Sequence, residues 1–305
     1  MSERDAATDA ASENTPDRPD SPLVRRARTF AARFRRNSLA MGGLIVTVGF
    51  LLIALLAPVI APYDPAAVDV PARLQGPSLA HPFGTDRYGR DLFSRVLYGA
   101  RIALQVAVAT PLLAATVGVP IGLTAGYVGG RVDDALMRLM DSIFAFPAIL
   151  LGLTLVAVFG QSLTNIVAAL GIVYIPQFAR VTRGSAVSVV EEEHVRVARS
   201  LGASHVRIVL VHVLPFCLSA ILVQATVTAA LAIVLESSLS FLGVGVPSPR
   251  PSWGSILRVG KGYVDSGEWW YSVFPGVAIV IAVLGFNLLG DGLRDVLDPR
   301  TDPNR

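Results

Sequence analysis

Few side chains in this sequence have the types and the spacing that catalysis or metal binding requires. The chain has one cysteine, Cys217, which excludes a disulfide framework and any site with several cysteine ligands. Its four histidines, at positions 81, 194, 205 and 212, have neither HxxxH nor HExxH spacing. The single lysine, Lys261, is followed by Gly262, so the chain lacks the GxxxxGK[ST] loop that cradles phosphates. These observations argue against an enzyme and against ATP hydrolysis by this chain.

The charged segment at about residues 183–213 has the signals of a helix start, and they indicate a mechanical element rather than a catalytic one. Ser188 and Glu191 have the spacing of a capping box, in which the serine oxygen and the glutamate side chain satisfy backbone N–H groups. Glu192 and Glu193 follow in the first turn, where the helix dipole favours negative charge. A short helix is therefore predicted to begin near these glutamates.

This predicted helix has one apolar face and a glycine at its end. Val195, Ala198 and Leu201 recur every third residue and define the face. Gly202 suits the left-handed residue that ends a helix, and Ser204 can cap a second one. Two interpretations fit the pattern equally well: a rigid lever pushed by a soluble partner, or an amphipathic helix that lies on a lipid surface.

Long uncharged runs dominate the rest of the chain, of which 52% is apolar and only 16% charged, with a mean hydropathy of +0.56. A transmembrane helix needs about 20 apolar residues. Because the longest run can hold two helices, the runs predict an all-α membrane protein with six transmembrane helices. Prolines 111, 120, 147 and 176 lie within these helices and are expected to kink them. The predicted spans are residues 39–61, 102–126, 137–159, 162–182, 214–237 and 271–290.

Arginines beside the first span set the expected orientation. Residues 1–24 are polar and contain prolines and serines, which predicts a disordered tail rather than a signal peptide. Six arginines between Arg25 and Arg36 precede the first span, and positive residues there favour the cytoplasmic side. Both termini are then expected in the cytoplasm.

The first outer loop contains charged residues at helical spacing. Within residues 84–101, the pairs Asp86/Arg90 and Asp91/Arg95 are four residues apart, which supports a helix. This amphipathic helix is expected either to position the mouth of a pathway or to lie on the lipid surface.

The sequence of the inner loop resembles a known motif. Residues 193–215 (EHVRVARSLGASHVRIVLVHVLP) are similar to the EAA loop of ABC importer permeases, and Ala198, Gly202, Leu214 and Pro215 match it. Arg196, Val197 and His212 stand where the motif has Glu, Ala and Ile, and the resemblance leaves open whether Glu192 or Glu193 supplies the acid. The resemblance implies that the loop contacts an ATPase through Glu192, Glu193, Val195, Ala198, Arg199, Leu201, Gly202, Ala203, Leu214 and Pro215.

Four further stretches, at residues 34–65, 81–104, 237–257 and 274–300, resemble the "C" type of dipeptide and oligopeptide permeases, a family that also includes nickel permeases. The resemblance implies a type I (MetI-like) ABC importer fold. The predicted organisation is a disordered cytoplasmic tail at 1–33, an N-terminal span at 34–65, an extracytoplasmic loop with an amphipathic helix at 66–101, a core of five spans at 102–292 that contains the coupling loop 183–215, and a cytoplasmic tail at 293–305.

Function follows from the resemblance. It implies a non-catalytic permease subunit, located in the bacterial cytoplasmic membrane, that moves peptides, or alternatively nickel or another small solute. The implied partners are a second related permease, two cytoplasmic ATPases that bind ATP and magnesium, an external solute-binding protein, the lipid bilayer and a peptide substrate. Neither a nucleic acid nor a cofactor or metal held by this chain is expected. The resemblance does not give peptide length, the lining of the pathway or the ATPase contacted.

Two other classes of membrane protein fit the sequence less well. A secondary carrier keeps an ionisable residue near mid-membrane, whereas His212, Asp141 and Glu236 all fall near the ends of the spans. An intramembrane enzyme needs a catalytic or metal-binding constellation, and the spans contain none. Both classes are therefore less favoured than an externally powered permease.

Overall fold

The computed structural model describes residue 32 and residues 34–297, and within them the chain is helical, with no strand beyond one isolated bridge between Thr85 and Asp91. The expected disordered tail at 1–33 lies almost entirely outside these residues. The helices are α2 (Ser38–Ile60), α3 (Leu92–Val128), α4 (Gly130–Phe144), α5 (Ala148–Phe159), α6 (Leu163–Val190), α7 (Glu193–Ser200), α8 (His205–Arg207), α9 (Leu214–Leu242), α10 (Trp253–Gly260) and α11 (Trp270–Leu297), with short 3₁₀ turns at Val70–Ala72 and Lys261–Tyr263 and a π-helix at Ile208–Val213.

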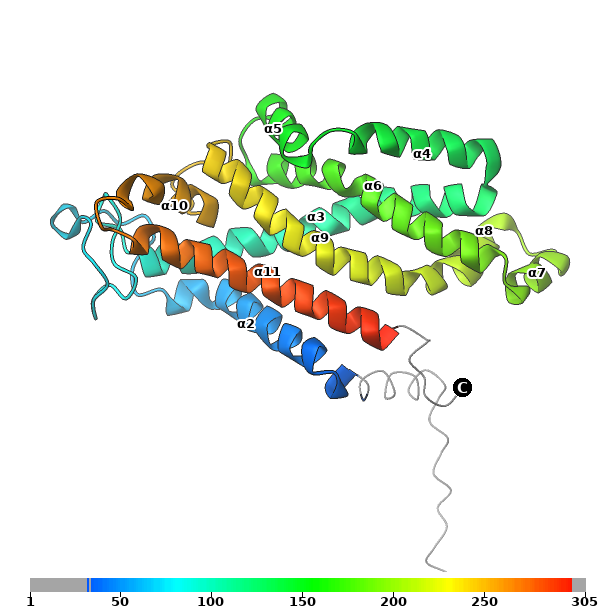
Figure 1. The fold of residues 1–305 in the computed structure, drawn as a ribbon, viewed down its shortest axis with the longest axis horizontal. Coiled ribbons are helices and arrows are strands. Elements are labelled where there is room, and N and C mark those ends of the chain that lie inside the picture. Colours follow the sequence, from blue (N-terminus) through cyan, green and yellow to red (C-terminus); the bar gives the residue numbers. More distant parts are fainter. Residues whose placement is uncertain (1–31, 33, 298–305) are drawn as a thin grey trace, which may run out of the picture.

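The helices run lengthwise between two ends of the molecule (Figure 1). We call one of them the loop end; it contains residues 61–91 and residues 243–269, which include α10. We call the other the corner end; it contains α7 and α8. Helix α3 packs most extensively against α6, and α9 packs against both. Helices α2 and α11 lie side by side, and the Asn37 amide donates to the Asp295 carboxylate near their free ends (3.1 Å).

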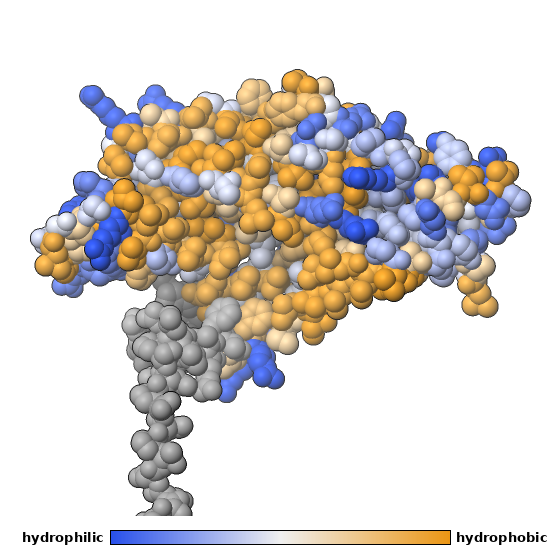
Figure 2. Space-filling model, turned by 180° about the vertical axis from the view of Figure 1, so that it is seen from behind, coloured by the Kyte–Doolittle hydropathy of each residue, from blue (hydrophilic) through white to orange (hydrophobic). Residues whose placement is uncertain are grey.

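Five helices of the described chain are long and apolar enough to cross a membrane, and the number becomes six when the bent pair α4 and α5 is counted as one span. This confirms the predicted spans for α2, α3, α6, α9 and α11. Apolar residues cover most of the middle of the face in Figure 2, and hydrophilic residues gather toward both ends. Large apolar side chains are exposed on several of the long helices, among them Ile45, Leu55, Val59 and Leu112, as expected where lipid or a second apolar subunit covers a protein.

The span expected at 137–159 is not one continuous helix. Helices α4 and α5 meet at an angle of 84°, with the break between Phe144 and Ala148. Pro147 provides the cause, since a proline disfavours helical geometry at the residue before it and donates no backbone hydrogen bond. Pro147 itself is extended (φ −54°, ψ 126°) and starts α5. The kink expected at Pro147 is therefore confirmed, and it is large enough to divide the run into two helices.

The expected helix over residues 84–101 is confirmed for residues 92–101, which begin α3, and is wrong for residues 84–91, which form a loop. The Asp91 side chain accepts a hydrogen bond from the Ser94 N–H (2.7 Å) and so caps α3. Asp86 and Arg90 do form an ion pair (2.6 Å), but within a turn and not along a helix. At the other terminus, α11 continues to Leu297, beyond the expected boundary at residue 292.

Helices α4 and α6 are joined by a two-pronged ion pair. The Arg183 Nε and Nη2 atoms donate to the two Asp133 carboxylate oxygens at 2.5 Å each, and the Asp133 side chain is 13% exposed. The fork of a guanidinium matches a carboxylate in this geometry. The pair therefore holds the corner end of α4 against the core.

We expect a double-mutant cycle of Asp133→Ala and Arg183→Ala to give a coupling energy of about 1 kcal/mol, because the Arg183 side chain is 39% exposed and solvent screens the pair. Thermal unfolding of the purified chain in detergent measures it. The Asp141–Arg180 pair is the matched control, since it joins the same two helices but is 60% and 40% exposed. Its coupling should be close to zero, and equal coupling for both pairs would contradict the role of burial.

Candidate coupling corner

At the corner end, α6 stops and the chain turns into the short helix α7. The expected capping box of Ser188 and Glu191 is wrong, because α6 continues through Val190 and the Ser188 hydroxyl donates within the helix to the Gly184 carbonyl. Glu191 ends α6. Glu192 has extended geometry (ψ 150°) and separates α6 from α7, which starts at Glu193. Ser188 is a residue whose hydroxyl can bond forward as a cap or backward inside a helix, and sequence spacing does not distinguish the two.

Helix α7 is fixed to the body of the protein by its buried face. Val195 is fully buried and Ala198 is 9% exposed, as predicted. Val195 joins the apolar cluster that contains Val189 of α6 and Val213 next to α9. Leu201 was expected on the same face but is 82% exposed, because the helix ends before it and the chain turns outward there. We call the buried contact that Val195 and Ala198 make with the body of the protein the seat of α7. The exposed Leu201 side chain projects from the end of the helix.

A glycine cap ends α7, as predicted. Gly202 has a φ of +80°, in the left-handed region that side-chain-bearing residues avoid. Its N–H donates to the Arg199 carbonyl (3.0 Å), and the Ala203 N–H donates to the Ala198 carbonyl (3.1 Å). These two bonds are the Schellman arrangement, in which the carbonyls at the end of a helix are satisfied by the reversing chain. Half-buried Ala203 then packs on the core cluster.

The chain returns to the body through a π-helix that sequence reasoning missed. The Ser204 hydroxyl caps the three-residue helix α8 by accepting from the Arg207 N–H (3.4 Å), in line with its predicted capping role. Residues 208–213 then take the wider π geometry, and the Leu214 N–H reaches back to the Val209 carbonyl. Pro215 explains the irregularity, since its missing N–H and its ring interrupt the regular pattern at the start of α9.

A groove with a volume of about 750 Å³ lies beside α7, and it brings together residues that no sequence pattern connected. The Tyr127 hydroxyl at the end of α3 lies 2.6 Å from Nδ1 of His205. The Arg199 guanidinium lies over the Tyr127 ring, 5.7 Å from its centre. Exposed Val206 and Leu210 line the same groove. The contact joins residues 78 positions apart, so neither periodicity nor a local motif could have predicted it.

The outward surface of α7 combines acidic, basic and apolar groups. Glu192 and Glu193 are exposed, and the Glu192 carboxylate lies 3.1 Å from Nδ1 of His194 at the start of the helix. Arg199 and Leu201 are exposed on the far end of the helix. Leu214 is half-buried and packs against the core cluster, whereas Pro215 is exposed. The predicted residues therefore divide into a buried seat and an exposed surface.

Comparisons with known proteins agree with this architecture. Residues 118–303 match the family model described as the binding-protein-dependent transport system inner membrane component, and residues 26–77 match the N-terminal TM domain of oligopeptide transport permease C. A putative peptide transport system permease protein of Brucella suis is 47% identical over 93% of this chain and 94% of its own length. The dipeptide transport system permease protein DppC of Alkalihalophilus pseudofirmus is 43% identical, and the match covers 88% of each chain.

A solved structure shares the fold at low sequence identity. The chain aligns with a chain of the MetNI methionine ABC transporter, in inward-facing conformations, with a TM-score of 0.56 and 17% identity. The alignment covers 67% of this chain and 96% of that one. Long apolar helices, joined at one end by a short capped helix, thus define a transmembrane permease of the MetI type. The chain belongs to the family of binding-protein-dependent transport system inner membrane components and is a permease subunit of an ABC importer.

Proposed function

We propose that this permease moves short peptides into the cell and forms half of the translocation pathway with a second, related permease. The names of its relatives support the substrate, because proteins at 47% and 43% identity are named for peptide and dipeptide transport. A relative of Escherichia coli that is 42% identical over 97% of this chain is named for glutathione, which is also a peptide. An external solute-binding protein would deliver the peptide at the loop end.

The corner end would receive the driving force. The observation that carries this proposal is the construction of α7, which has a buried seat at Val195 and Ala198 and an exposed surface that ends in Leu201. A soluble ATPase that binds ATP and magnesium would dock on this surface. The seat joins α7 to α6 and α9. A displacement of the bound ATPase would therefore move both helices together. The ATPase would in this way shift the permease between two conformations without contacting the peptide.

This assignment places the corner end and both termini in the cytoplasm of a bacterium, within its inner membrane. The arginines that precede α2 support the orientation, since positive residues favour the cytoplasmic side. The chain itself would carry neither a catalytic group nor a cofactor. ATP hydrolysis would take place wholly in the partner subunits.

Cysteine cross-linking tests the docking surface. We expect Leu201→Cys, in a Cys217→Ser background, to cross-link to an ATPase subunit through a short bismaleimide in membranes that contain the complete transporter. Leu79→Cys is the matched control, because Leu79 is a fully exposed leucine at the loop end. Cross-linking of Leu79→Cys but not Leu201→Cys to the ATPase would reverse the orientation. ATP-driven uptake of radiolabelled dialanine into proteoliposomes tests the substrate, and its absence with all partners present would refute peptide transport.

A further inference from the structure

A pocket at the loop end is lined by arginines that the coupling mechanism does not use. It has a volume of about 410 Å³ and lies between the end of α9, α10 and the loop before α3. No aspartate or glutamate lines it, whereas its walls include five arginines: Arg87, Arg90, Arg95, Arg250 and Arg258. A concentration of like charge in one concave site costs free energy unless an anion enters.

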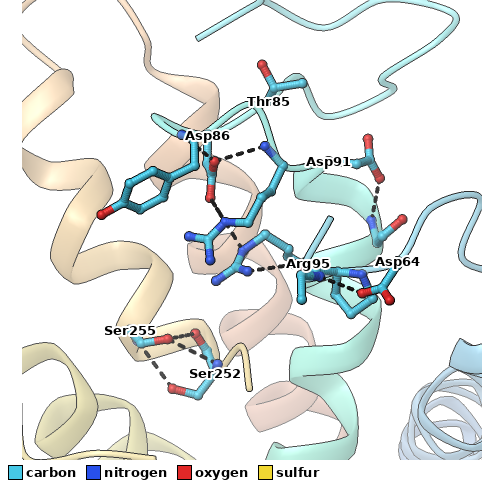
Figure 3. A network of polar contacts seen from close by, with 12 residues as sticks. Asp64, Thr85, Asp86, Asp91, Arg95, Ser252 and Ser255 are labelled. Atoms are coloured by element: carbon cyan, nitrogen blue, oxygen red, sulfur yellow. Dashed lines mark hydrogen bonds and ion pairs between the residues drawn. The ribbon is translucent and has the colours of Figure 1, made fainter. Parts of the chain in front are cut away.

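The buried carboxylate of Asp86 interacts with only two of the five arginines, Arg90 and Arg95. Asp86 is fully buried and accepts from the backbone N–H groups of Tyr88 (2.8 Å) and Arg90 (3.0 Å). Its second oxygen accepts from Arg90 Nε at 2.6 Å and lies 3.7 Å from Arg95 Nε (Figure 3). The Arg95 side chain also donates to the Pro65 carbonyl (2.8 Å). Asp86 therefore stabilises the loop that forms this wall of the pocket. Both of its carboxylate oxygens already accept hydrogen bonds from that loop.

The other arginines are free to meet a ligand. Within the part of the chain that the structure describes, Arg87, Arg250 and Arg258 have no ion-pair partner. Arg87 lies over the ring of Tyr88, 4.6 Å from its centre, in a stack that fixes its direction without neutralising it. The Arg258 guanidinium packs on Gly243, where an added Cβ would lie 2.8 Å from its Cζ atom. Arg87 and Arg258 are thus positioned by their neighbours, and no acidic side chain of the described chain pairs with either of them.

The cationic lining continues beyond this pocket toward α3. A second pocket of about 350 Å³ shares Pro249 and Arg250 with the first and adds Arg101. The remaining lining mixes proline, valine, isoleucine and tyrosine with polar side chains, which are serines at positions 240, 248 and 255 and Gln161 in the first pocket and Gln105 in the second. Hydroxyl and amide groups of this kind suit a polar ligand in water rather than a lipid tail.

We infer that this arginine pocket binds the terminal carboxylate of a peptide before it crosses the membrane. The inference rests on the proposed peptide transport and adds a binding site to it. The fork of a guanidinium binds a carboxylate through two parallel hydrogen bonds, which makes arginine the preferred partner for this group. A concave site of this volume holds the end of a short peptide, whereas an acidic protein surface would need a broad, open patch.

Saturation-transfer NMR on the full-length chain in nanodiscs, without a solute-binding protein, tests the site directly. The probes are dialanine and dialanine amide, which differ in the carboxylate alone. We expect dialanine to bind at least about fivefold more tightly than its amide, and acetate to compete with it. The double variant Arg250→Gln/Arg258→Gln should weaken dialanine binding at least about tenfold. Arg73→Gln, an exposed arginine at the same end but outside the pocket, is the matched control.

Equal binding of dialanine and its amide, or unchanged binding by the double variant, would overturn the inference. Both substituted arginines are exposed, so the variant should keep the thermal unfolding temperature of the wild type. In the complete transporter, the double variant should raise the KM for dialanine uptake. If it instead raised only the concentration of solute-binding protein required for uptake, the arginines would serve protein docking and the inference would fail. Wild-type chains that import no peptide at all would refute the proposed function itself.

Discussion

Replacement of Gly202 with proline is expected to abolish ATP-driven uptake while the chain still inserts and folds. Proline fixes φ near −65°, whereas Gly202 has a φ of +80°. Proline also removes the N–H that donates to the Arg199 carbonyl. The chain then cannot reverse after Leu201, so α7 and the returning segment lose their relative positions. We expect uptake to fall more than about tenfold, since the local change costs about 3 kcal/mol or more.

Uptake of radiolabelled peptide and ATPase activity of the reconstituted transporter measure this effect. Gly267→Pro is the matched control, because Gly267 also has a positive φ (+104°), donates its N–H to a carbonyl three residues earlier and has open space around its α-carbon, but lies at the loop end. It should retain uptake. Charge reversal of Glu192 and Glu193 should also lower uptake, because both are exposed on the proposed docking surface. Full uptake by Gly202→Pro would show that the corner does not transmit force.

The apolar helices were predictable because their length is set by the membrane and not by tertiary contacts. A run without charges that is bounded by polar residues marks a span, and α2 begins and ends within one residue of its predicted limits. The glycine cap at Gly202 was predictable for a similar reason, since the requirement for a positive φ is local. Features that depend on a few neighbouring residues are thus readable in the sequence.

The failures have two physical causes, of which the first is that the same spacing supports more than one geometry. Asp86 and Arg90 are four residues apart both in a helix and in the observed turn, and only the fully buried position of Asp86 reveals which one forms. Pro147 predicts a kink in its uncharged run, but the sequence pattern is equally compatible with a slight bend and with the observed 84° corner. The second cause is that the contact of Tyr127 with His205, like the convergence of arginines at the loop end, exists only after distant helices have packed.

A glycine stripe on α3 had a sequence signal that was not recognised. Gly118, Gly122 and Gly126 are four residues apart in an apolar helix, the spacing that lets two membrane helices approach closely. They face α6, the helix with which α3 packs most extensively. A Cβ on Gly118 would lie 2.7 Å from the Ile175 carbonyl oxygen, and one on Gly126 would lie 3.0 Å from the Arg183 carbonyl oxygen. The α6 backbone itself therefore occupies the space of the missing side chains.

Gly122→Leu is accordingly expected to prevent the stable folding of the chain. A Cβ at this position would lie 2.7 Å from the Cβ of Thr182 and 2.9 Å from the Arg183 backbone nitrogen. Overpacking a core costs about 1–3 kcal/mol when side chains can move aside. Here the obstacle is a helix backbone, which no change of rotamer relieves, so we expect the cost to exceed about 3 kcal/mol. The yield of monodisperse protein in detergent and its unfolding temperature measure this loss.

Gly184→Leu on α6 separates the effect of packing from the effect of inserting a leucine. Gly184 is also a glycine within a helix, but it is exposed and an added Cβ would meet nothing within 4 Å. This control should fold normally and gain slightly from the higher helix propensity of leucine. Because α7 is seated on α6, loosening α3 from α6 would also detach the corner from the body of the protein. Close contact between α3 and α6 at the glycine stripe is therefore required both for stable folding and for coupling. A Gly122→Leu chain that folds and transports would contradict both requirements.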